Sequence, residues 1–212
     1  MKKEIYTDNG VITFTERIPV NGIKTLDIPK ATANLLDFKQ VMDQHNVEFG
    51  LIYGTLLGAV REKNFIAHDE DIDLFMLAEN KKSIISALHD VLDKGFEIIR
   101  YSDKLLSVSR DNEYIDVYFF KKSKLFYRKC DVGLTAKAKY LENTIDYPFL
   151  GDTFQVPKDP ESFLVDLYGK NWRIPKKNDP SMNHDKYIIL RERIRKKAPF
   201  LFSILSKIKK SI

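Results

Sequence analysis

Acidic and apolar residues alternate along residues 71–76, DIDLFM. Because successive side chains of a β-strand point to opposite faces of a sheet, this segment predicts a strand whose three aliphatic and thioether side chains enter the core. Asp71 and Asp73 then share the other face, with α-carbons about 6.5 Å apart. At about 5 Å and an effective dielectric constant near 20, two carboxylates repel by roughly 3 kcal/mol. The pattern therefore predicts a divalent cation, and Mg²⁺ prefers one or two carboxylates together with substrate phosphates.

The same alternation recurs at residues 114–119, YIDVYF, where Asp116 lies opposite an apolar face formed by Ile115, Val117 and Phe119. If this strand pairs beside the first, Asp116 joins the aspartate pair. Three carboxylates on adjacent strands are typical of a two-metal site for phosphoryl transfer.

A glycine turn, Gly54-Thr55, lies between a predicted buried strand and a predicted short helix. Free amides at a helix start, the close approach that glycine permits and a hydroxyl together make a phosphate-binding site. Arg61 can add a bidentate phosphate contact, and Lys63 is a second candidate. The alternative is that Gly54 and Gly58 only permit tight packing.

Hydrophobic periodicity and turn residues predict the other elements. Asp27 and Pro29 are typical of a helix start, and Leu35, Phe38 and Met42 follow at helical spacing. Helices are expected at residues 30–46, 56–61, 80–93 and 159–168, and strands at residues 47–53, 71–76, 96–101, 105–110 and 114–120. This order predicts an α+β fold, with a mixed sheet and helices packed mainly on one face.

We expect three regions: an extended N-terminal arm (1–29), a catalytic domain (30–185) and a basic amphipathic C-terminal helix (186–212). The net charge is +5, and basic residues crowd the last region, namely Arg191, Arg193, Arg195, Lys196, Lys197, Lys207, Lys209 and Lys210. This helix has an apolar stripe, so it either contacts an anionic membrane or packs on the domain. Over its strongly basic part, residues 191–212, the only aromatic residues are Phe200 and Phe202, which disfavours nucleic acid.

The composition is that of a globular protein, with 43% hydrophobic and 12% aromatic residues. The single cysteine, Cys130, excludes an internal disulfide and is expected to be a packed thiol. No apolar segment follows the charged start, as a secretory signal would require, and no run of 18 apolar residues occurs. We therefore expect a cytoplasmic protein, peripheral on the membrane if the basic helix binds there.

Residues 54–73, GTLLGAVREKNFIAHDEDID, resemble the signature of the LicD/fukutin family, whose usual form is GTLLGAVR, a short basic linker and FIPWDDDID. Residues 114–117 resemble the later aspartate strand of that family. Residues 156–158 and 168–175 resemble its C-terminal Y-G-x-x-W-x-x-P element. The resemblance spans roughly residues 30–180. Two departures are Ala67-His68, in place of Pro-Trp, and Glu70, in place of the middle aspartate; His68 is either a phosphate or metal ligand or a loop residue without such a role.

The resemblance implies a nucleotidyltransferase-like fold and transfer of phosphocholine or phosphoribitol from a CDP-linked donor to a glycan or lipid-linked glycan. It makes Asp71, Asp73 and Asp116 the catalytic, metal-binding residues, with Mg²⁺ or Mn²⁺ as cofactor. Gly54, Thr55, Arg61 and Lys63 would bind the donor phosphate. One alternative is an enzyme that places a nucleotide on a small molecule or protein, and another is a non-catalytic basic module that binds a membrane or nucleic acid.

Overall fold

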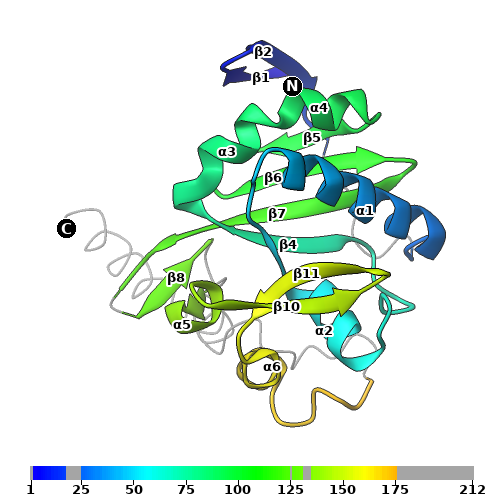
Figure 1. Cartoon of the computed structure of the whole chain (residues 1–212), viewed down its shortest axis with the longest axis vertical. Helices are drawn as coiled ribbons and strands as arrows, with labels where there is room; N and C mark the ends of the chain where they lie inside the picture. Colours follow the sequence, from blue (N-terminus) through cyan, green and yellow to red (C-terminus); the bar gives the residue numbers. More distant parts are fainter. Residues whose placement is uncertain (1, 18–24, 125, 131–134, 176–212) are drawn as a thin grey trace, which may run out of the picture.

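A nine-stranded mixed β-sheet organises the computed structural model, which describes residues 2–17, 25–124, 126–130 and 135–175 (Figure 1). Its strands are β3 (Gly50–Leu51), β4 (Ile72–Leu77), β5 (Glu97–Tyr101), β6 (Leu105–Arg110), β7 (Glu113–Lys122), β8 (Tyr127–Lys129), β9 (Thr135–Lys137), β10 (Thr144–Phe149) and β11 (Asp152–Pro157). The main path runs β10-β11-β3-β4-β7-β6-β5, with β8 and β9 attached beside β7. The β4–β7 and β11–β3 pairs are parallel and the others antiparallel. The predicted mixed sheet is confirmed.

Six α-helices lie among the described residues. They are α1 (Ile28–Gln44), α2 (Tyr53–Arg61), α3 (Lys81–Ser86), α4 (Leu88–Asp93), α5 (Ala138–Leu141) and α6 (Pro160–Tyr168), with a 3₁₀ turn, η1 (Ala78–Asn80). Figure 1 shows α1, α3 and α4 over the same face of the sheet, and α2 behind the β10–β11 hairpin. Helix α1 starts where the sequence predicts, because the Asp27 side chain accepts a hydrogen bond from the Lys30 amide and Pro29 lies in the first turn.

The helix-covered face of β4 and β7 forms the centre of the core. Ile72 and Leu74 lie beside Ile115 and Val117 across the parallel pair, and all four side chains are fully buried. Burying each such side chain contributes roughly 1.5–3 kcal/mol. The alternation that places these residues inside also turns the intervening aspartates to the opposite face.

Two predicted elements are wrong in extent. The single helix expected at residues 80–93 is divided into η1, α3 and α4, because the chain turns at Ala87 (ψ −6°). Both halves then bury side chains, Ile84 from α3 and Val91 from α4. The strand expected at residues 47–53 shrinks to β3, because the Val47 amide closes the end of α1 and α2 begins early, at residue 53.

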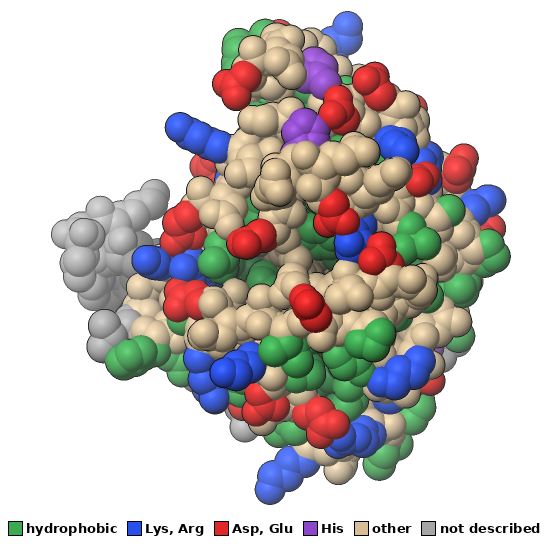
Figure 2. All heavy atoms as spheres, viewed as in Figure 1, with side chains coloured by type: hydrophobic (Ala, Val, Ile, Leu, Met, Phe, Trp, Pro, Cys, Tyr) green, Lys and Arg blue, Asp and Glu red, His purple; other side chains and the backbone are tan. Residues whose placement is uncertain are grey.

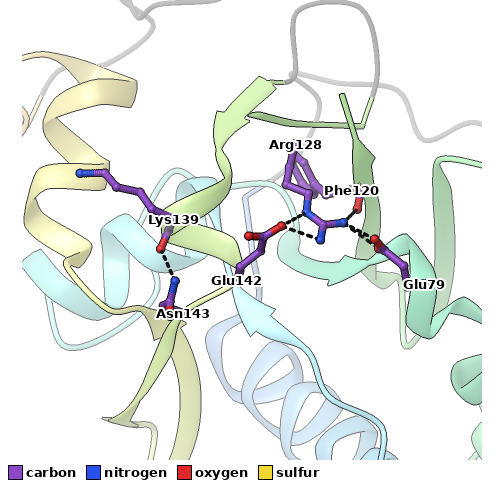
Figure 3. A network of polar contacts seen from close by, with 6 residues as sticks. All are labelled: Glu79, Phe120, Arg128, Lys139, Glu142 and Asn143. Atoms are coloured by element: carbon purple, nitrogen blue, oxygen red, sulfur yellow. Dashed lines mark hydrogen bonds and ion pairs between the residues drawn. The ribbon is translucent and has the colours of Figure 1, made fainter. Parts of the chain in front are cut away.

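A buried arginine on β8 links the segments around β8 and α5, a region for which the sequence predicted no elements. Arg128 on β8 is 3% exposed, and its guanidinium binds Glu79 in η1 and Glu142 after α5 at 2.7–2.8 Å (Figure 3). It also donates to the Phe120 carbonyl oxygen at 3.4 Å. Cys130 is buried nearby, with Sγ 3.0 Å from the Lys104 carbonyl oxygen, as the packed-thiol prediction required.

The N-terminal arm contains an antiparallel hairpin, β1 (Lys2–Thr7) with β2 (Gly10–Thr15), and the Arg17 amide donates to the Ile99 carbonyl on β5. The expected basic helix at residues 186–212 lies outside the described residues, and the boundaries at 29 and 185 stay predictions. None of the described helices combines the length and apolar character that crossing a membrane requires. Figure 2 shows acidic and basic side chains interspersed over the face that carries α1, α3 and α4.

Candidate active site

The predicted carboxylates meet on the sheet face opposite α1. Strands β4 and β7 are parallel neighbours, and Asp73 lies directly beside Asp116 in their register. Asp71 immediately precedes β4 and shares the face of Asp73. The side chains of Asp73 and Asp116 are buried, at 7% and 3% exposure. The strand pairing on which the three-aspartate hypothesis depended is therefore present.

The glycine turn holds Asp73 in place. The Thr55 hydroxyl accepts a hydrogen bond from the Asp73 amide at 2.8 Å, and the Gly54 amide donates to Asp73 Oδ2 at 3.2 Å. Thr55 is fully buried, so its side chain supports the strand start and does not line an open phosphate site. Gly54 is half-buried at the first turn of α2, where its amide already faces a carboxylate.

Asp69 is a fourth carboxylate of the site, and the sequence analysis did not single it out. Its Oδ2 atom would lie 2.3 Å from a Cβ built on Gly54, which shows how closely the loop packs on the start of α2. This atom is buried and has no hydrogen-bond partner among the described residues. The signal that could have identified Asp69 is its spacing, because it lies two residues before Asp71, as Asp71 lies two before Asp73.

The pKa values of the four crowded carboxyl groups are all raised above their usual range. Burial, followed by the charges of Asp116 and Asp69, raises the pKa of Asp71 to about 7. Burial raises the pKa of Asp69 to about 6, and burial together with the neighbouring carboxylates raises the pKa of Asp73 well above its usual value. Burial also raises the pKa of Asp116, although the charge of Arg100 opposes this shift. A cation at the cluster would reverse these shifts, because it favours the ionised forms.

Arg100 on β5 is a second residue that the sequence analysis missed. Its Nη2 atom donates to both oxygens of Asp116, at 2.8 and 2.7 Å, and its Nε atom donates to the Ser107 hydroxyl at 2.9 Å. Its positive charge also opposes the rise in the pKa of Asp71, so it acts on two of the four carboxylates. No motif identified Arg100, because its contact with Asp116 depends on the order of the strands.

Tyrosine rings enclose the carboxylates. Tyr114 hydrogen-bonds to Asp71 and Tyr118 to Asp116. Tyr53 packs edge-to-face on Tyr118, with ring centroids 5.4 Å apart. Burial, followed by the charge of Asp73, raises the pKa of Tyr53, Tyr118 and Tyr168, so these phenols stay protonated and can donate hydrogen bonds.

The basic residues predicted to bind phosphate have protein partners. Arg61 donates from Nη1 to the Trp172 carbonyl oxygen at 3.2 Å and from Nε to Glu62 at 2.7 Å. Lys63 donates to the Tyr147 hydroxyl at 2.6 Å and is largely exposed. His68 is exposed and makes no hydrogen bond or ion pair with the part of the chain that the structure describes. The positive charge of Arg61 opposes the rise in the pKa of Tyr168.

The carboxylates of the site offer oxygen donors to a divalent cation. In the described ranges, no group of three or more His, Cys, Asp or Glu side chains is arranged to hold a metal ion. The pair Asp71 and Asp73 still fits Mg²⁺, because its donors are oxygen atoms and Mg²⁺ needs only one or two carboxylates with substrate phosphates. The orphaned Asp69 Oδ2 is a further buried acceptor beside this pair. The metal-ligand role expected of Asp116 stays a prediction.

Curated relatives of the chain include a human enzyme. It is 28% identical over 174 residues to "Ribitol-5-phosphate transferase FKTN" of Homo sapiens, covering 77% of this chain but 38% of that protein. The macaque protein of the same name, from Macaca fascicularis, is 27% identical with the same coverage. "Uncharacterized protein RP689" of Rickettsia prowazekii (strain Madrid E) is 26% identical and covers 90% of this chain and 67% of its own. The chain thus spans well under half the length of the first two relatives.

Solved structures with some likeness include ANT(2")-Ia in complex with adenylyl-2"-tobramycin, at 14% identity and a TM-score of 0.49, covering 86% of this chain and 98% of that one. The lincosamide antibiotic adenylyltransferase LnuA, lincomycin-bound, has 11% identity and a TM-score of 0.45, with 63% and 83% coverage. The family match is firmer, because it extends over residues 46–159, more than half of the chain, and contains the glycine turn and all four carboxylates. The chain belongs to the LicD/FKTN/FKRP family and carries its nucleotidyltransferase domain.

Proposed function

We propose that the chain is a Mg²⁺-dependent phosphotransferase that moves a phospho-alcohol from a CDP-linked donor to a glycan hydroxyl and releases CMP. The observation that carries the proposal is the alignment of Asp73 with Asp116 on parallel strands, beside Asp71 and the start of α2. The family match supports a transferase, and the name of the human relative supports phosphoribitol as the group transferred. Phosphocholine is the second donor group to test.

Asp71 and Asp73 would hold the cation, which supplies charge neutralisation for the donor diphosphate. The Gly54 amide, Arg61 and Lys63 are proposed to bind donor phosphate oxygens, and the two basic side chains would exchange their present protein acceptors for phosphate. The acceptor oxygen attacks the distal phosphorus in line as its proton passes to Asp116 or to solvent. The new O–P bond forms as the bond from that phosphorus to the oxygen of the CMP leaving group breaks. Positioning and electrostatic stabilisation supply most of the rate enhancement in such a reaction.

Asp116 has two candidate roles: to complete a second metal site, or to take the proton of the acceptor hydroxyl. Both roles require carboxylate oxygen atoms that Arg100 holds. The acceptor is proposed to be a glycan or lipid-linked glycan, with the basic C-terminal helix reaching a membrane surface.

The proposal is tested by incubating the purified chain with Mg²⁺, a glycan acceptor and either CDP-ribitol or CDP-choline, and measuring CMP. We expect CMP release that requires Mg²⁺ and is lost by orders of magnitude in the Asp71→Asn, Asp73→Asn double variant. Exposed Asp103, which forms a surface ion pair with Lys81, provides the matched control Asp103→Asn. Equal turnover in the double variant and the control would refute the assignment.

A nucleotidyltransferase activity is the second candidate, and the description of the matched domain favours it. The same carboxylates would then act on a nucleoside triphosphate, and the product would carry the nucleotide. Mass spectrometry of the product separates the two reactions, because a phospho-alcohol and a nucleotide add different masses to the acceptor. Metal-dependent turnover of either kind would exclude the non-catalytic binding module.

A further inference from the structure

A single row of polar side chains crosses four strands on the carboxylate face. Asp73 on β4 lies beside Asp116 on β7, which lies beside Ser107 on β6, which lies beside Arg100 on β5. Cross-strand neighbours in register project from the same face of a sheet. The row therefore starts with the acidic pair and ends with a guanidinium.

A β-bulge brings Arg100 into this row. The β5–β6 register runs Ile98 to Val108 and then jumps to Arg100 opposite Ser107, leaving one extra residue on β5. Without the extra residue, Ile99 would lie opposite Ser107 and Arg100 would project to the other face, beneath the helices. Bulges near active sites commonly re-aim a side chain in this way.

The Asp116 carboxylate has little capacity left for a metal ion. It accepts two contacts from Arg100 Nη2, at 2.7 and 2.8 Å, and one hydrogen bond each from Ser107 and Tyr118. An ionised carboxylate offers about four lone-pair positions, so these contacts fill them. The Asp116 side chain is only 4% exposed, and the Arg100 side chain is 23% exposed.

The other three aspartates differ in this respect. Asp73 accepts at Oδ2 from the Gly54 amide, Asp71 accepts from Tyr114, and Asp69 Oδ2 has no partner among the described residues. Oxygen atoms that can ligate a cation therefore gather at the 69–73 side of the cluster. The positively charged guanidinium of Arg100 lies at the other side of the cluster, against Asp116.

We propose that the site binds one divalent cation, at the 69–73 side, and that Arg100 takes the place of a second cation by holding Asp116. Arg100 is a positioning residue in this arrangement: it holds both oxygen atoms of Asp116 and adds a positive charge beside the donor phosphates. Its Nη1 atom has no hydrogen-bond partner in the described ranges, and its partial exposure lets a phosphate oxygen reach it. This inference rests on the proposed function in one respect, namely that the site binds a metal ion.

The test counts bound Mn²⁺, used in place of Mg²⁺, by electron paramagnetic resonance of the free ion. We expect one ion per wild-type chain, two ions for Arg100→Gln, and one for Arg100→Gln combined with Asp116→Asn. The second ion is expected because the variant frees the two Asp116 carboxylate oxygen atoms that Arg100 Nη2 contacts. Arg110→Gln is the matched control, because Arg110 also binds a carboxylate, that of Asp37 at 2.7 Å, on a separate side-chain network. The Arg110→Gln protein should bind one ion per chain, as the wild type does.

Asp116→Asn alone keeps the inference testable if Arg100→Gln does not fold. The variant should bind one ion with less than about threefold change in affinity, whereas loss of a true ligand would weaken binding at least tenfold. Two ions in the wild type, one ion in folded Arg100→Gln, or a tenfold loss in Asp116→Asn would overturn the inference. A correct ion count without CMP release would instead refute the proposed reaction and leave the role of Arg100 intact.

Discussion

Replacing Asp71 by asparagine should stabilise the metal-free protein at alkaline pH while abolishing its activity. Asp71 is buried among like charges, and its pKa rises from 3.8 to about 7 on folding. Below pH 4 the carboxyl is protonated in both the folded and unfolded states and contributes nothing to the pH dependence. Between pH 4 and 7 the folded state retains a proton that the unfolded state has lost, so stability falls as the pH rises.

The penalty is complete above pH 7. A shift of about three pKa units corresponds to about 4 kcal/mol, which is an upper bound because the chain relaxes around the charge. Asparagine removes the charge, and its carbonyl oxygen can still accept the hydrogen bond from Tyr114. We therefore expect Asp71→Asn to increase the free energy of unfolding by about 2–4 kcal/mol at pH 8, or about 5–15 °C in Tm for a chain of this size.

The assay is thermal unfolding in EDTA at pH 5 and pH 8, with Asp103→Asn as the exposed control. The wild type should unfold at a lower temperature at pH 8 than at pH 5, and Asp71→Asn should remove most of this difference. Mg²⁺ should restore the wild type at pH 8 and have little effect on the variant. An Asp71→Asn protein destabilised equally at both pH values would refute the argument that carboxylate crowding strains the site.

Three further substitutions test contacts that position the site. Thr55→Val removes the buried acceptor of the Asp73 amide, and we expect a loss of about 1–3 kcal/mol in urea unfolding together with reduced Mn²⁺ affinity. An unchanged affinity would show that the hydroxyl does not position the ligand. Gly54→Ala introduces a Cβ 2.3 Å from Asp69 Oδ2, so it should lower the rate of CMP release at least tenfold. An unchanged rate of CMP release would show that the Asp69 side chain can move aside without affecting catalysis. Arg128→Met removes the bridge between two partly exposed glutamates, and we expect a loss of about 2–4 kcal/mol in urea unfolding, with no change in the number of bound ions.

Much of the fold could be predicted because its elements are locally encoded. Asp27 caps α1, Asp159 caps α6, and Gly169 ends α6 with a positive φ of 84°, each at its expected place. The turn between β6 and β7 also follows its residues, since Asp111 and Asn112 adopt the left-handed conformation that such side chains tolerate. The break at Ala87 was missed because alanine favours a continuing helix and tertiary packing of the two halves overrides this preference.

The sequence by itself determined that Asp71, Asp73 and Asp116 would leave the core, because a period of two assigns them to the face opposite buried apolar residues. It also determined the family, through the run from Gly54 to Asp73. Only the tertiary structure decided that β7 lies beside β4, that Asp69 packs on Gly54, and that Arg100 reaches Asp116. These contacts depend on the order of the strands and on one bulged residue in β5. Neither can be predicted from the local sequence pattern, because each arises from pairing between segments far apart in the chain.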